Sequence, residues 1–481
     1  MRICLATRHA EPSFTPLSLL YLRAFLIERE GWAPGDVQMA EFYPDTPGDQ
    51  IAAHLLRTGA DLVGLSCYVW NITALMEAAR LVRAARPHAM IAIGGPEVGP
   101  IAREVLAAHP AVDVVVRSEG EVPFGAIARA RRDGASLDEI PGITFRRDGA
   151  IVETSDAPIL KSLDSLPSPH KPEYGDFDGR TVCIETQRGC VFRCTFCFYN
   201  KDLSIRNRRF DLDRVKGEIR SWLDRRPAYI YLMDPIFNLN AERAKAICRF
   251  IAEHNTAGVP FHAEIWAEFV DEELAALFKA ANFRFLEVGL QTTDQGALAA
   301  VERRLKLQPF LDGIRFLTQY DLPFELQLIH GLPDETPASF RQSLDFAASL
   351  DPPHLAAFPL MVLPGTELWR TATALGLEYD PDPPYLVRSH PAMDEAEMAW
   401  GRRMSDAVEV IGQARTFRLL AREPGVGLRT VVEAWMARHP VEPPAGNRHA
   451  EMLAFVPAFC REHGIPTKFY EGFAAWEFGG R

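Results

Sequence analysis

The sequence of 481 residues contains no apolar run near the roughly 18 residues that a membrane-spanning helix needs. Its first residues, MRICLATRHAEPSF, lack the long apolar stretch and the small-residue cleavage site of an export signal. We therefore expect a cytoplasmic protein without a membrane span, whose eight cysteines are reduced. Clustered cysteines in a reducing compartment indicate metal binding or catalysis rather than disulfides.

Positive charge is also scarce, because 52 lysines and arginines face 64 aspartates and glutamates, giving a net charge of -12. General nucleic-acid binding requires a basic surface, so the sequence predicts no nucleic-acid partner. Internal repeats and low-complexity segments are absent from the sequence as well. With 47% hydrophobic residues the composition is that of an ordinary globular protein. The acidic net charge favours small-molecule or peptide substrates, and because no peptide- or RNA-binding appendage is recognisable we expect a small molecule.

Hydrophobic periodicity divides this α/β chain into four parts. Residues 1–145 alternate apolar strands with helices, which predicts a Rossmann-like, doubly wound parallel sheet. Residues 146–180 are expected to form a connector, with a β-hairpin that turns at Asp148 and a proline-rich stretch. Residues 181–380 hold about six further β/α units, typical of a partial or full (β/α) barrel. The strand pattern then stops, and residues 381–481 predict a small, mostly helical C-terminal domain.

The most unusual segment is ETQRGCVFRCTFCFYN, residues 185–200, which gathers Cys190, Cys194 and Cys197 within eight positions. Thiolates bind iron–sulfur clusters, zinc and copper(I). A structural zinc site normally has four ligands, and Cys183 could supply the fourth. Cys183 lies in the apolar run TVCIET, however, where a buried small side chain is the more ordinary role. Three thiolates on a four-iron cluster would instead leave one iron open for a substrate or cofactor.

The C-x3-C-x2-C spacing after a first barrel strand, with the aromatic Phe196 before the last cysteine, resembles the radical S-adenosylmethionine (SAM) superfamily. Later segments resemble further elements of that family in the same order: MDPIFN (233–238), EVGLQTTD (287–294), LIHGLPDET (328–336) and FPLMVLPGTEL (358–368). The resemblance implies that the three cysteines bind a [4Fe-4S] cluster whose open iron binds SAM. Reductive cleavage of SAM would give a 5′-deoxyadenosyl radical and would require an external electron donor such as flavodoxin or ferredoxin.

The first domain resembles the cobalamin-binding domains that are attached to radical SAM barrels. The resemblance is carried by TPLSLLYLRAFL (15–26), DLVGLSCYVWN (61–71), IAIGGPEVG (91–99) and VVVRSEGEVPF (114–124). It implies that residues near the carboxyl ends of the strands bind cobalamin, namely Ser66, Tyr68, Trp70, Gly94, Gly95, Glu119 and Gly120. The glycines would allow a large corrin to approach the backbone closely.

The chain departs from many cobalamin domains in lacking D-x-H-x-x-G, the motif whose histidine binds cobalt. His9 is an isolated loop histidine, for which a solvated or capping role is the more ordinary one. Tyr68 and Trp70 are positioned either to cover the lower face of cobalamin or to pack at the domain junction. Domains of this type also persist as scaffolds without the cofactor, and that alternative stays open at this point.

Polar residues of the barrel supply the remaining candidates. Asp234 ends the apolar strand AYIYLMD, where a contact to SAM or substrate and a capping role are both open. Glu264 shares a strand face with His262, and a charge facing the inside of a barrel needs a partner or a ligand. We predict Asp234 and Glu264 as catalytic residues, and Gln291 with Phe196 as part of the cofactor site.

Together the resemblances imply a cobalamin-dependent radical SAM enzyme that methylates an unactivated carbon or phosphorus. A carbon without acidic hydrogens cannot attack the SAM methyl group, so the radical would remove a hydrogen atom and methylcobalamin would supply the methyl group. Cyclisation or rearrangement with the same cofactors is an alternative, as is a zinc- or cluster-bearing binding protein without turnover. A methylthiotransferase is disfavoured because residues 1–145 offer only Cys4 and Cys67 as further ligands.

Overall fold

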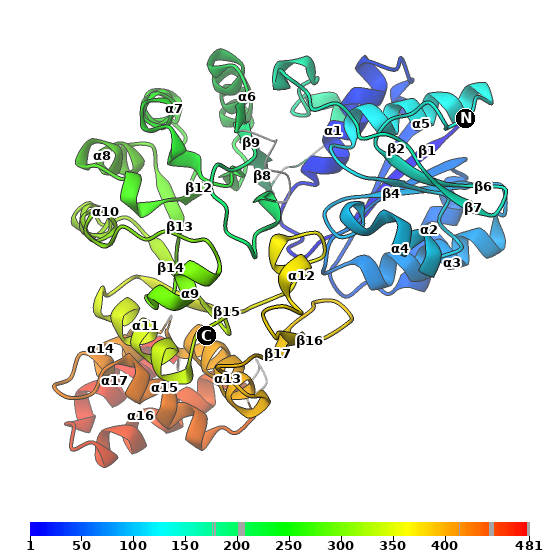
Figure 1. The fold of residues 1–481 in the computed structure, drawn as a ribbon. Helices are drawn as coiled ribbons and strands as arrows, with labels where there is room; N and C mark the ends of the chain where they lie inside the picture. The colour runs from blue at the N-terminus through cyan, green and yellow to red at the C-terminus, as the bar shows by residue number, and fades with distance from the viewer. Residues whose placement is uncertain (176, 178, 201–206, 413, 442–446, 479–481) are drawn as a thin grey trace.

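The computed structural model describes residues 1–175, 177, 179–200, 207–412, 414–441 and 447–478. Two α/β units lie side by side, and a group of helices at the C-terminal end of the chain lies next to the second unit (Figure 1). None of the helices in these ranges has the length and apolar character needed to cross a membrane.

The first unit is built on a seven-stranded sheet with the order β2-β1-β3-β4-β5-β6-β7. Its parallel strands are β1 (Ile3–Arg8), β2 (Val37–Phe42), β3 (Leu62–Ser66), β4 (Met90–Gly94) and β5 (Val114–Val116). The helices are α1 (Leu17–Glu28), α2 (Gly48–Thr58), α3 (Ile72–Ala85), α4 (Ala102–Ala108) and α5 (Glu121–Asp133). Alternate residues of β1 enter two separate buried clusters, one with α1 and α5 and the other with α2, α3 and α4. The predicted doubly wound parallel sheet is therefore confirmed.

A hairpin of β6 (Ile143–Arg147) and β7 (Ala150–Glu153) continues this sheet antiparallel to β5. Asp148 and Gly149 turn it with φ angles of 50° and 82°, which glycine adopts freely and aspartate tolerates. The expected turn is present, but the hairpin belongs to the first sheet. The boundary expected at residue 145 therefore falls inside an element of the first unit.

The second unit is an open (β/α) barrel of six parallel strands in the order β15-β14-β13-β12-β11-β8. The strands are β8 (Thr181–Ile184), β11 (Tyr229–Leu232), β12 (Phe261–Ile265), β13 (Phe283–Gln291), β14 (Phe324–His330) and β15 (His354–Pro359). The outer helices are α6 (Leu212–Arg225), α7 (Ala241–His254), α8 (Glu272–Ala280), α10 (Leu307–Gln319) and α11 (Pro337–Ser349). The short helix α9 (Gln295–Ala300) follows β13 and packs in a separate cluster with Leu332 and Leu368. Buried and partly exposed residues alternate along β13, because one face packs on the helices and the other lines the interior. The barrel is thus confirmed, in its partial form.

A segment of the first unit covers the free edge of β8. Thr15 N–H donates to Thr181 O at 3.0 Å, and Thr181 N–H donates to Ser13 O at 2.8 Å. Phe14 forms a parallel bridge with Thr181, and Cys183 N–H donates to the Thr15 hydroxyl at 3.1 Å. The loop after β1 therefore pairs with the first barrel strand and satisfies backbone groups that an open edge would expose.

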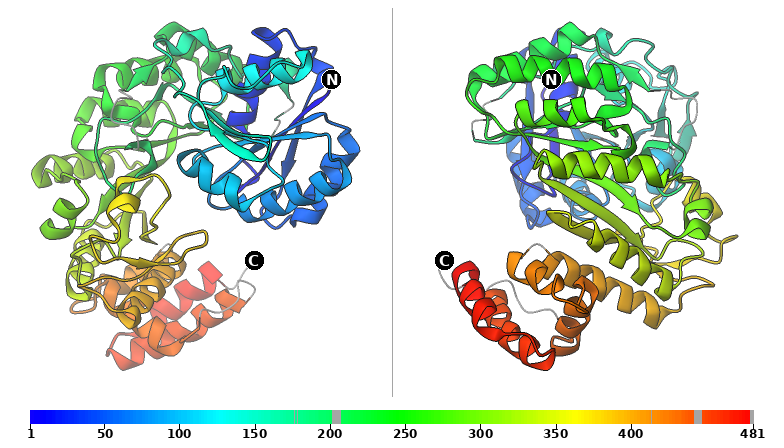
Figure 2. Two further views of the ribbon diagram at one scale, coloured as in Figure 1. Left: turned by 45° about the vertical axis from the view of Figure 1, so that its right-hand side comes forward. Right: turned by 90° about the vertical axis from the view of Figure 1, so that its left-hand side faces the viewer.

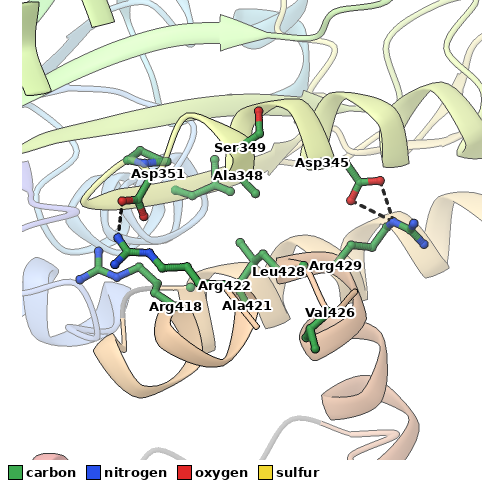
Figure 3. A pocket seen from close by; sticks show the side chains of 14 residues that line it. Asp345, Ala348, Ser349, Asp351, Arg418, Ala421, Arg422, Val426, Leu428 and Arg429 are labelled. Atoms are coloured by element: carbon green, nitrogen blue, oxygen red, sulfur yellow. Dashed lines mark hydrogen bonds and ion pairs between the residues drawn. The ribbon is translucent and has the colours of Figure 1, made fainter. Parts of the chain in front are cut away.

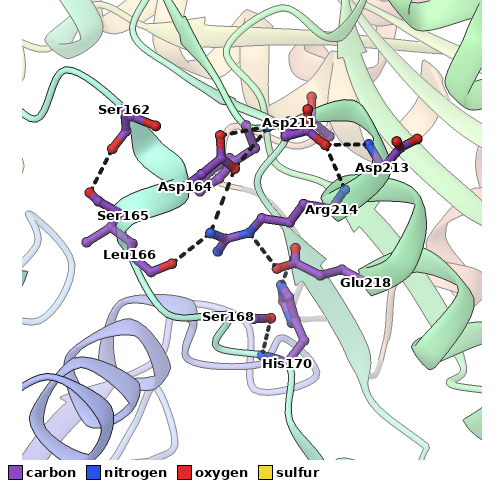
Figure 4. Close-up of polar contacts among 12 residues, drawn as sticks. Ser162, Asp164, Ser165, Leu166, Ser168, His170, Asp211, Asp213, Arg214 and Glu218 are labelled. Carbon is purple, nitrogen blue, oxygen red and sulfur yellow. Dashed lines mark hydrogen bonds and ion pairs between the residues drawn. The ribbon is translucent and has the colours of Figure 1, made fainter.

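The segment that links the two units is held against the start of α6 (Figure 4). Asp164 accepts from Asp211 N–H through both oxygens, at 3.0 and 3.2 Å. Arg214 donates from Nη1 to Leu166 O at 2.7 Å and from Nε to Glu218 at 3.1 Å. Apart from a 3-10 turn at Leu163–Ser165, side-chain bonds therefore hold this part of the connector.

The C-terminal elements share a core with the barrel. They are α12 (Glu367–Thr371), β16 (Glu378–Tyr379), β17 (Val387–Ser389), α13 (Glu395–Gly412), α14 (Arg415–Ala421), α15 (Leu428–Arg438), α16 (Arg448–Glu462) and α17 (Thr467–Phe478). Phe417, Trp435 and Phe455 belong to the same buried cluster as the barrel strands. Figure 2 shows these helices stacked below the barrel. The helical C-terminal part is confirmed, although it adds a short hairpin and packs on the barrel.

Candidate functional site

Cys190, Cys194 and Cys197 lie in the loop after β8, at the end of the barrel where the strands end. The short strands β9 (Gln187–Arg188) and β10 (Arg208–Arg209) pair at the base of this loop. Cys194 is buried, and the other two cysteines are partly exposed. Burial raises the pKa of the Cys190 thiol, and that of the Cys197 thiol to about 12. The thiolate forms that bind metal would therefore depend on the positive charge of bound iron.

Within the described ranges, no group of three or more His, Cys, Asp or Glu side chains is arranged to hold a single metal ion. A four-iron cluster makes a different demand, because each cysteine binds a separate iron. Arg303 also fits such a cluster, since its Nη1 donates to Cys194 Sγ at 3.7 Å and its charge opposes the rise in the pKa of Cys190. Cys183 is completely buried in β8, as a packing residue would be.

Trp266 and Arg303 back the cysteine loop, and no pattern in the sequence marks either of them as a site residue. The Trp266 ring stacks on Phe192 with centroids 4.0 Å apart, and the Arg303 guanidinium lies 4.4 Å from the Trp266 centroid. Asn238 holds Trp266 by two backbone bonds of 2.9 Å, and Arg303 also donates to Gly289 O. The loop therefore rests on an aromatic and cationic wall built from β11–β13 and the segment after α9.

Asp234 is fully buried and holds the turn that leads into the cysteine loop. Its Oδ1 accepts from Thr186 N–H at 2.7 Å and Gln187 N–H at 3.1 Å, and its Oδ2 accepts from the Thr186 hydroxyl at 2.5 Å. Burial raises the pKa of Asp234 to about 7. These contacts hold the turn after β8 rather than the turn that follows Asp234, and the catalytic role of Asp234 stays a prediction.

We expect Asp234→Ala to destabilise the protein by about 1–3 kcal/mol, because buried backbone donors lose their acceptor. Asp234→Asn should cost less, since its Oδ1 can keep both backbone bonds and the Thr186 hydroxyl can rotate to accept from the amide. Urea denaturation measures both changes. A folded Asp234→Asn variant that binds the cluster but cannot cleave SAM would instead assign Asp234 to the chemistry.

Glu264 faces the barrel interior from β12 and accepts from the Tyr231 hydroxyl at 2.7 Å. Burial, together with the nearby Glu287 carboxylate, raises the pKa of Glu264 to about 7. His262 is 2.7 Å from Glu287 and stacks on Tyr231 with centroids 4.1 Å apart, and Gln327 donates to Glu287 at 2.9 Å. A carboxyl group that titrates near neutral pH can hold or release a proton, so the catalytic role of Glu264 stays a prediction.

Gln291 and Phe196 occupy different surroundings at this end of the barrel. Gln291 ends β13 with a φ of 70°, and a Cβ at Gly289 would lie 2.4 Å from its Nε2, so the glycine makes room for the side chain. Phe196 packs against a buried cluster that includes Leu332 and Leu368. Phe196 therefore anchors the cysteine loop on the barrel, and the predicted roles of Phe196 and Gln291 in the cofactor site stay predictions.

Glu335 links two of the segments on which the family resemblance rests. It accepts from the Thr292 hydroxyl at 3.0 Å and from Gly331 N–H at 2.9 Å, and it is fully buried. Burial raises the pKa of Glu335 to about 8. This carboxyl therefore keeps its proton in the folded protein at a pH where it would ionise in the unfolded chain.

Because the pKa of Glu335 is raised, its contribution to stability is present at low pH and is lost as the pH rises. We expect the free energy of unfolding to fall between about pH 4.5 and about pH 8, by up to roughly 1.4 kcal/mol per pH unit from this group. Glu335→Gln should flatten that slope in urea denaturation of the cofactor-free protein. Equal slopes in the variant and the parent would show that Glu335 ionises normally when folded.

A cavity of about 630 Å³ opens between the two units. The barrel contributes Glu185, Arg188, Tyr199, Tyr231 and Met233. The seven residues predicted to bind cobalamin all line it from the first unit: Ser66, Tyr68, Trp70, Gly94, Gly95, Glu119 and Gly120. The cavity lies at the carboxyl ends of the first sheet's strands, where ligands of such sheets bind.

The aromatic pair in this cavity is available to a flat ligand. Tyr68 and Trp70 stack with centroids 4.5 Å apart and an interplanar angle of 6°, and 46% of Trp70 is exposed. The Tyr68 hydroxyl donates to Ser18 at 3.4 Å, and the Ser18 and Ser66 hydroxyls are 3.1 Å apart. Flat exposed rings and hydroxyls fit a corrin with amide side chains, so the cavity suits cobalamin.

Three residues of this cavity are engaged with other parts of the protein: Gly95 lies close to the backbone, and Glu119 and His9 are paired with charged side chains. A Cβ at Gly95 would lie 2.3 Å from Cys67 O, so the glycine is required by the protein's own backbone rather than by a ligand. Glu119 is paired with two arginines of the barrel, and His9 Nε2 is 2.8 Å from Glu41. Gly95 therefore has a role in the protein's own backbone and the Glu119 carboxylate is already paired, while the roles of both residues in cobalamin binding stay predictions.

A second cavity, of about 540 Å³, lies between α11 and the C-terminal helices (Figure 3). Arg429 Nε is 3.0 Å from both oxygens of Asp345, and Arg422 pairs with Asp351. None of the site residues predicted from the sequence lines this cavity. Its charged groups bridge the barrel and the C-terminal helices.

Two protein families match this chain. Residues 3–128 match the B12 binding domain, and residues 184–347 match the Radical SAM superfamily. The first range lies within the first sheet unit and the second within the open barrel. The cysteine loop falls in the second range, and the cavity is lined by residues of both.

Proteins similar to this chain include two methyltransferases and one solved structure. The cobalamin-dependent radical SAM methyltransferase TokK of Streptomyces tokunonensis is 27% identical over 96% of this chain and 68% of TokK. The 2-(S-pantetheinyl)-carbapenam-3-carboxylate methyltransferase of Streptantibioticus cattleyicolor is 29% identical over 69% of this chain and 51% of that protein. The structure of the cobalamin-dependent SAM radical enzyme OxsB, with aqua-cobalamin and SAM bound, superposes with a TM-score of 0.68. That match covers 99% of this chain and 78% of OxsB at 13% identity, so it demonstrates a shared fold.

Proposed function

We propose that this chain, a radical SAM enzyme with an N-terminal B12-binding domain, methylates an unactivated carbon or phosphorus of a small molecule. The observation that carries the proposal is the cavity between the two domains, with Tyr68 and Trp70 on one wall and Tyr199 and Tyr231 on the other. Methyl transfer by two cofactors requires that both reach one substrate, and this cavity is lined from both domains, including Tyr199, two residues after Cys197. The names of TokK and of the carbapenam enzyme describe methyl transfer as well.

The chain's own residues have separable tasks in this reaction. When bound, the [4Fe-4S] cluster supplies the electron that cleaves SAM, and cobalamin supplies the methyl group. Cys190, Cys194 and Cys197 would hold the cluster, and the Arg303 guanidinium offsets their negative charge. Glu264, with its pKa near 7, can hold or move a proton at its carboxylate inside the barrel.

We also propose that a flavodoxin or ferredoxin in a reducing cytoplasm supplies the electrons, and that the chain binds no nucleic acid. Exposed residues beside the cysteine loop include Val191 and three basic residues, Arg193, Arg304 and Lys306, against one acidic residue, Glu302. A locally basic surface with an apolar residue suits an acidic carrier protein. The net charge of the whole chain, -12, is unfavourable for nucleic acid.

Anaerobic reconstitution with iron, sulfide and hydroxocobalamin tests the proposal. With a reductant, methyl-deuterated SAM and candidate small-molecule substrates, we expect 5′-deoxyadenosine, S-adenosylhomocysteine and a product that carries the labelled methyl group. Without cobalamin, 5′-deoxyadenosine should still form while the labelled product disappears. A product that loses hydrogen without gaining a methyl group would indicate cyclisation, and a lack of 5′-deoxyadenosine would indicate a binding protein.

A further inference from the structure

A buried ionic network ties the base of the cysteine loop to the B12-binding domain. Arg208 donates to both oxygens of Glu119, at 2.7 and 2.9 Å. Arg188 donates to Glu119 at 3.2 Å, to Glu121 at 2.7 Å and to Glu185 at 2.9 Å. The side chains of this set are between 6% and 24% exposed. We call these five residues the loop tie.

The loop tie connects the two places where cofactors are expected. Arg188 and Arg208 are paired across β9 and β10, which close the loop that carries the cysteines, and Arg188 precedes Cys190 by two residues. On the other side, residues 119–121 connect β5 to α5 and line the cavity between the domains. The same backbone turn therefore faces the cobalamin cavity and holds the base of the cluster loop.

The ion pairs of the loop tie share members and are buried, so they depend on one another, unlike independent ion pairs on the surface. Burial alone would raise the pKa of Glu119, but the hydrogen bonds and charges of Arg208 and Arg188 hold it below its ordinary value. The Arg188 guanidinium also lies 4.8 Å from the ring centroid of Tyr21, another residue of the cavity. Two arginines serve three carboxylates here, so removing either arginine would leave buried carboxylate charge under-compensated, and the members are ordered together.

We propose that Glu119, Arg188 and Arg208 are positioning residues that couple cobalamin binding to the geometry of the cluster loop. A ligand that orders residues 119–121 also orders the two arginines and the strand pair from which the cysteines extend. By thermodynamic linkage, an assembled cluster then favours cobalamin by the same factor. The inference rests on the proposed function only in requiring that both cofactors bind, and it needs no turnover.

Titration of the full-length protein with hydroxocobalamin, followed by absorbance, tests the coupling with and without the assembled cluster. In the parent, cluster assembly should tighten cobalamin binding roughly fivefold or more. In Arg208→Gln that factor should fall towards one, and Arg208→Lys should give an intermediate factor because it keeps the charge but not the two-oxygen contact. Arg209→Gln is the matched control, because Arg209 follows Arg208 on β10 but is exposed and donates to Asn207.

Glu119→Gln provides a second variant on the other side of the interface, and it should lose the coupling as Arg208→Gln does. A parent-like factor in either folded variant, or a factor near one in the parent, overturns the inference. A parent that fails to bind cobalamin overturns it too. A different result would contradict the proposed function alone. A chain that shows the coupling but forms no methylated product would support the role of the loop tie and contradict the proposed reaction.

Discussion

Cys194→Ala should abolish both 5′-deoxyadenosine and methylated product, leaving only the level seen without enzyme. The reason is that two thiolates cannot hold a four-iron cluster in the way that three can. Cys194 is the buried member of the three cysteines and receives a hydrogen bond from Arg303. Iron and sulfide content, the cluster's visible absorption and the yield of 5′-deoxyadenosine measure the effect.

Cys183→Ala is the control for this experiment, and it also separates a cluster from a zinc site. Cys183 is completely buried in β8, and burial raises the pKa of its thiol to about 12. We expect this variant to keep its cluster and its SAM cleavage. A four-cysteine zinc site would lose its metal in Cys183→Ala and Cys194→Ala alike, and the parent would then contain zinc without sulfide.

The second large effect is expected from Gly120→Trp, which should weaken cobalamin binding by roughly 10- to 100-fold. Gly120 has φ -81° and ψ -21°, which any residue can adopt, and the nearest atom to an added Cβ is Leu22 Cδ2 at 3.5 Å. The backbone therefore tolerates a side chain here. Because Gly120 lines the cavity between the domains, a large ring would occupy cofactor space.

Gly120→Ala is the matched control and should bind hydroxocobalamin as the parent does. In Gly120→Trp, the cysteine loop keeps its ligands, so SAM cleavage should continue while methyl transfer falls with cobalamin occupancy. Equilibrium titration and the ratio of 5′-deoxyadenosine to methylated product report these two effects. Parent-like cobalamin affinity in Gly120→Trp would show that the corrin does not approach the turn between β5 and α5.

Much of the fold could be predicted because parallel strands covered on both faces are apolar runs, such as residues 62–66 and 181–184. The sequence did not predict that the hairpin Ile143–Arg147 and Ala150–Glu153 would join the first sheet. Its turn residues are a local signal, but whether its first strand pairs with β5 depends on backbone partners distant in sequence. The shared core of barrel and C-terminal helices escaped prediction for a similar reason, since an amphipathic helix does not reveal what covers its apolar face.

In the candidate site, too, residues with a local sequence signal could be predicted, and residues brought together by long-range contacts could not. The cysteines could be found because three ligands of one cluster lie within one loop, so their spacing is visible in the sequence. Arg303 could not, because it reaches Cys194 from 109 residues away. Glu119 was singled out from its place after β5, but its pairing with Arg208 spans 89 residues and no local pattern encodes it.

The segment that covers the edge of β8 has a consequence for how the protein is made. Thr15 precedes its partner Cys183 by 168 residues, so during synthesis the first domain is complete before the first barrel strand emerges. An uncovered strand edge is a template for pairing with the wrong chain. Here the cover already exists when the edge appears, and a barrel expressed without the first domain would emerge with β8 open to aggregation.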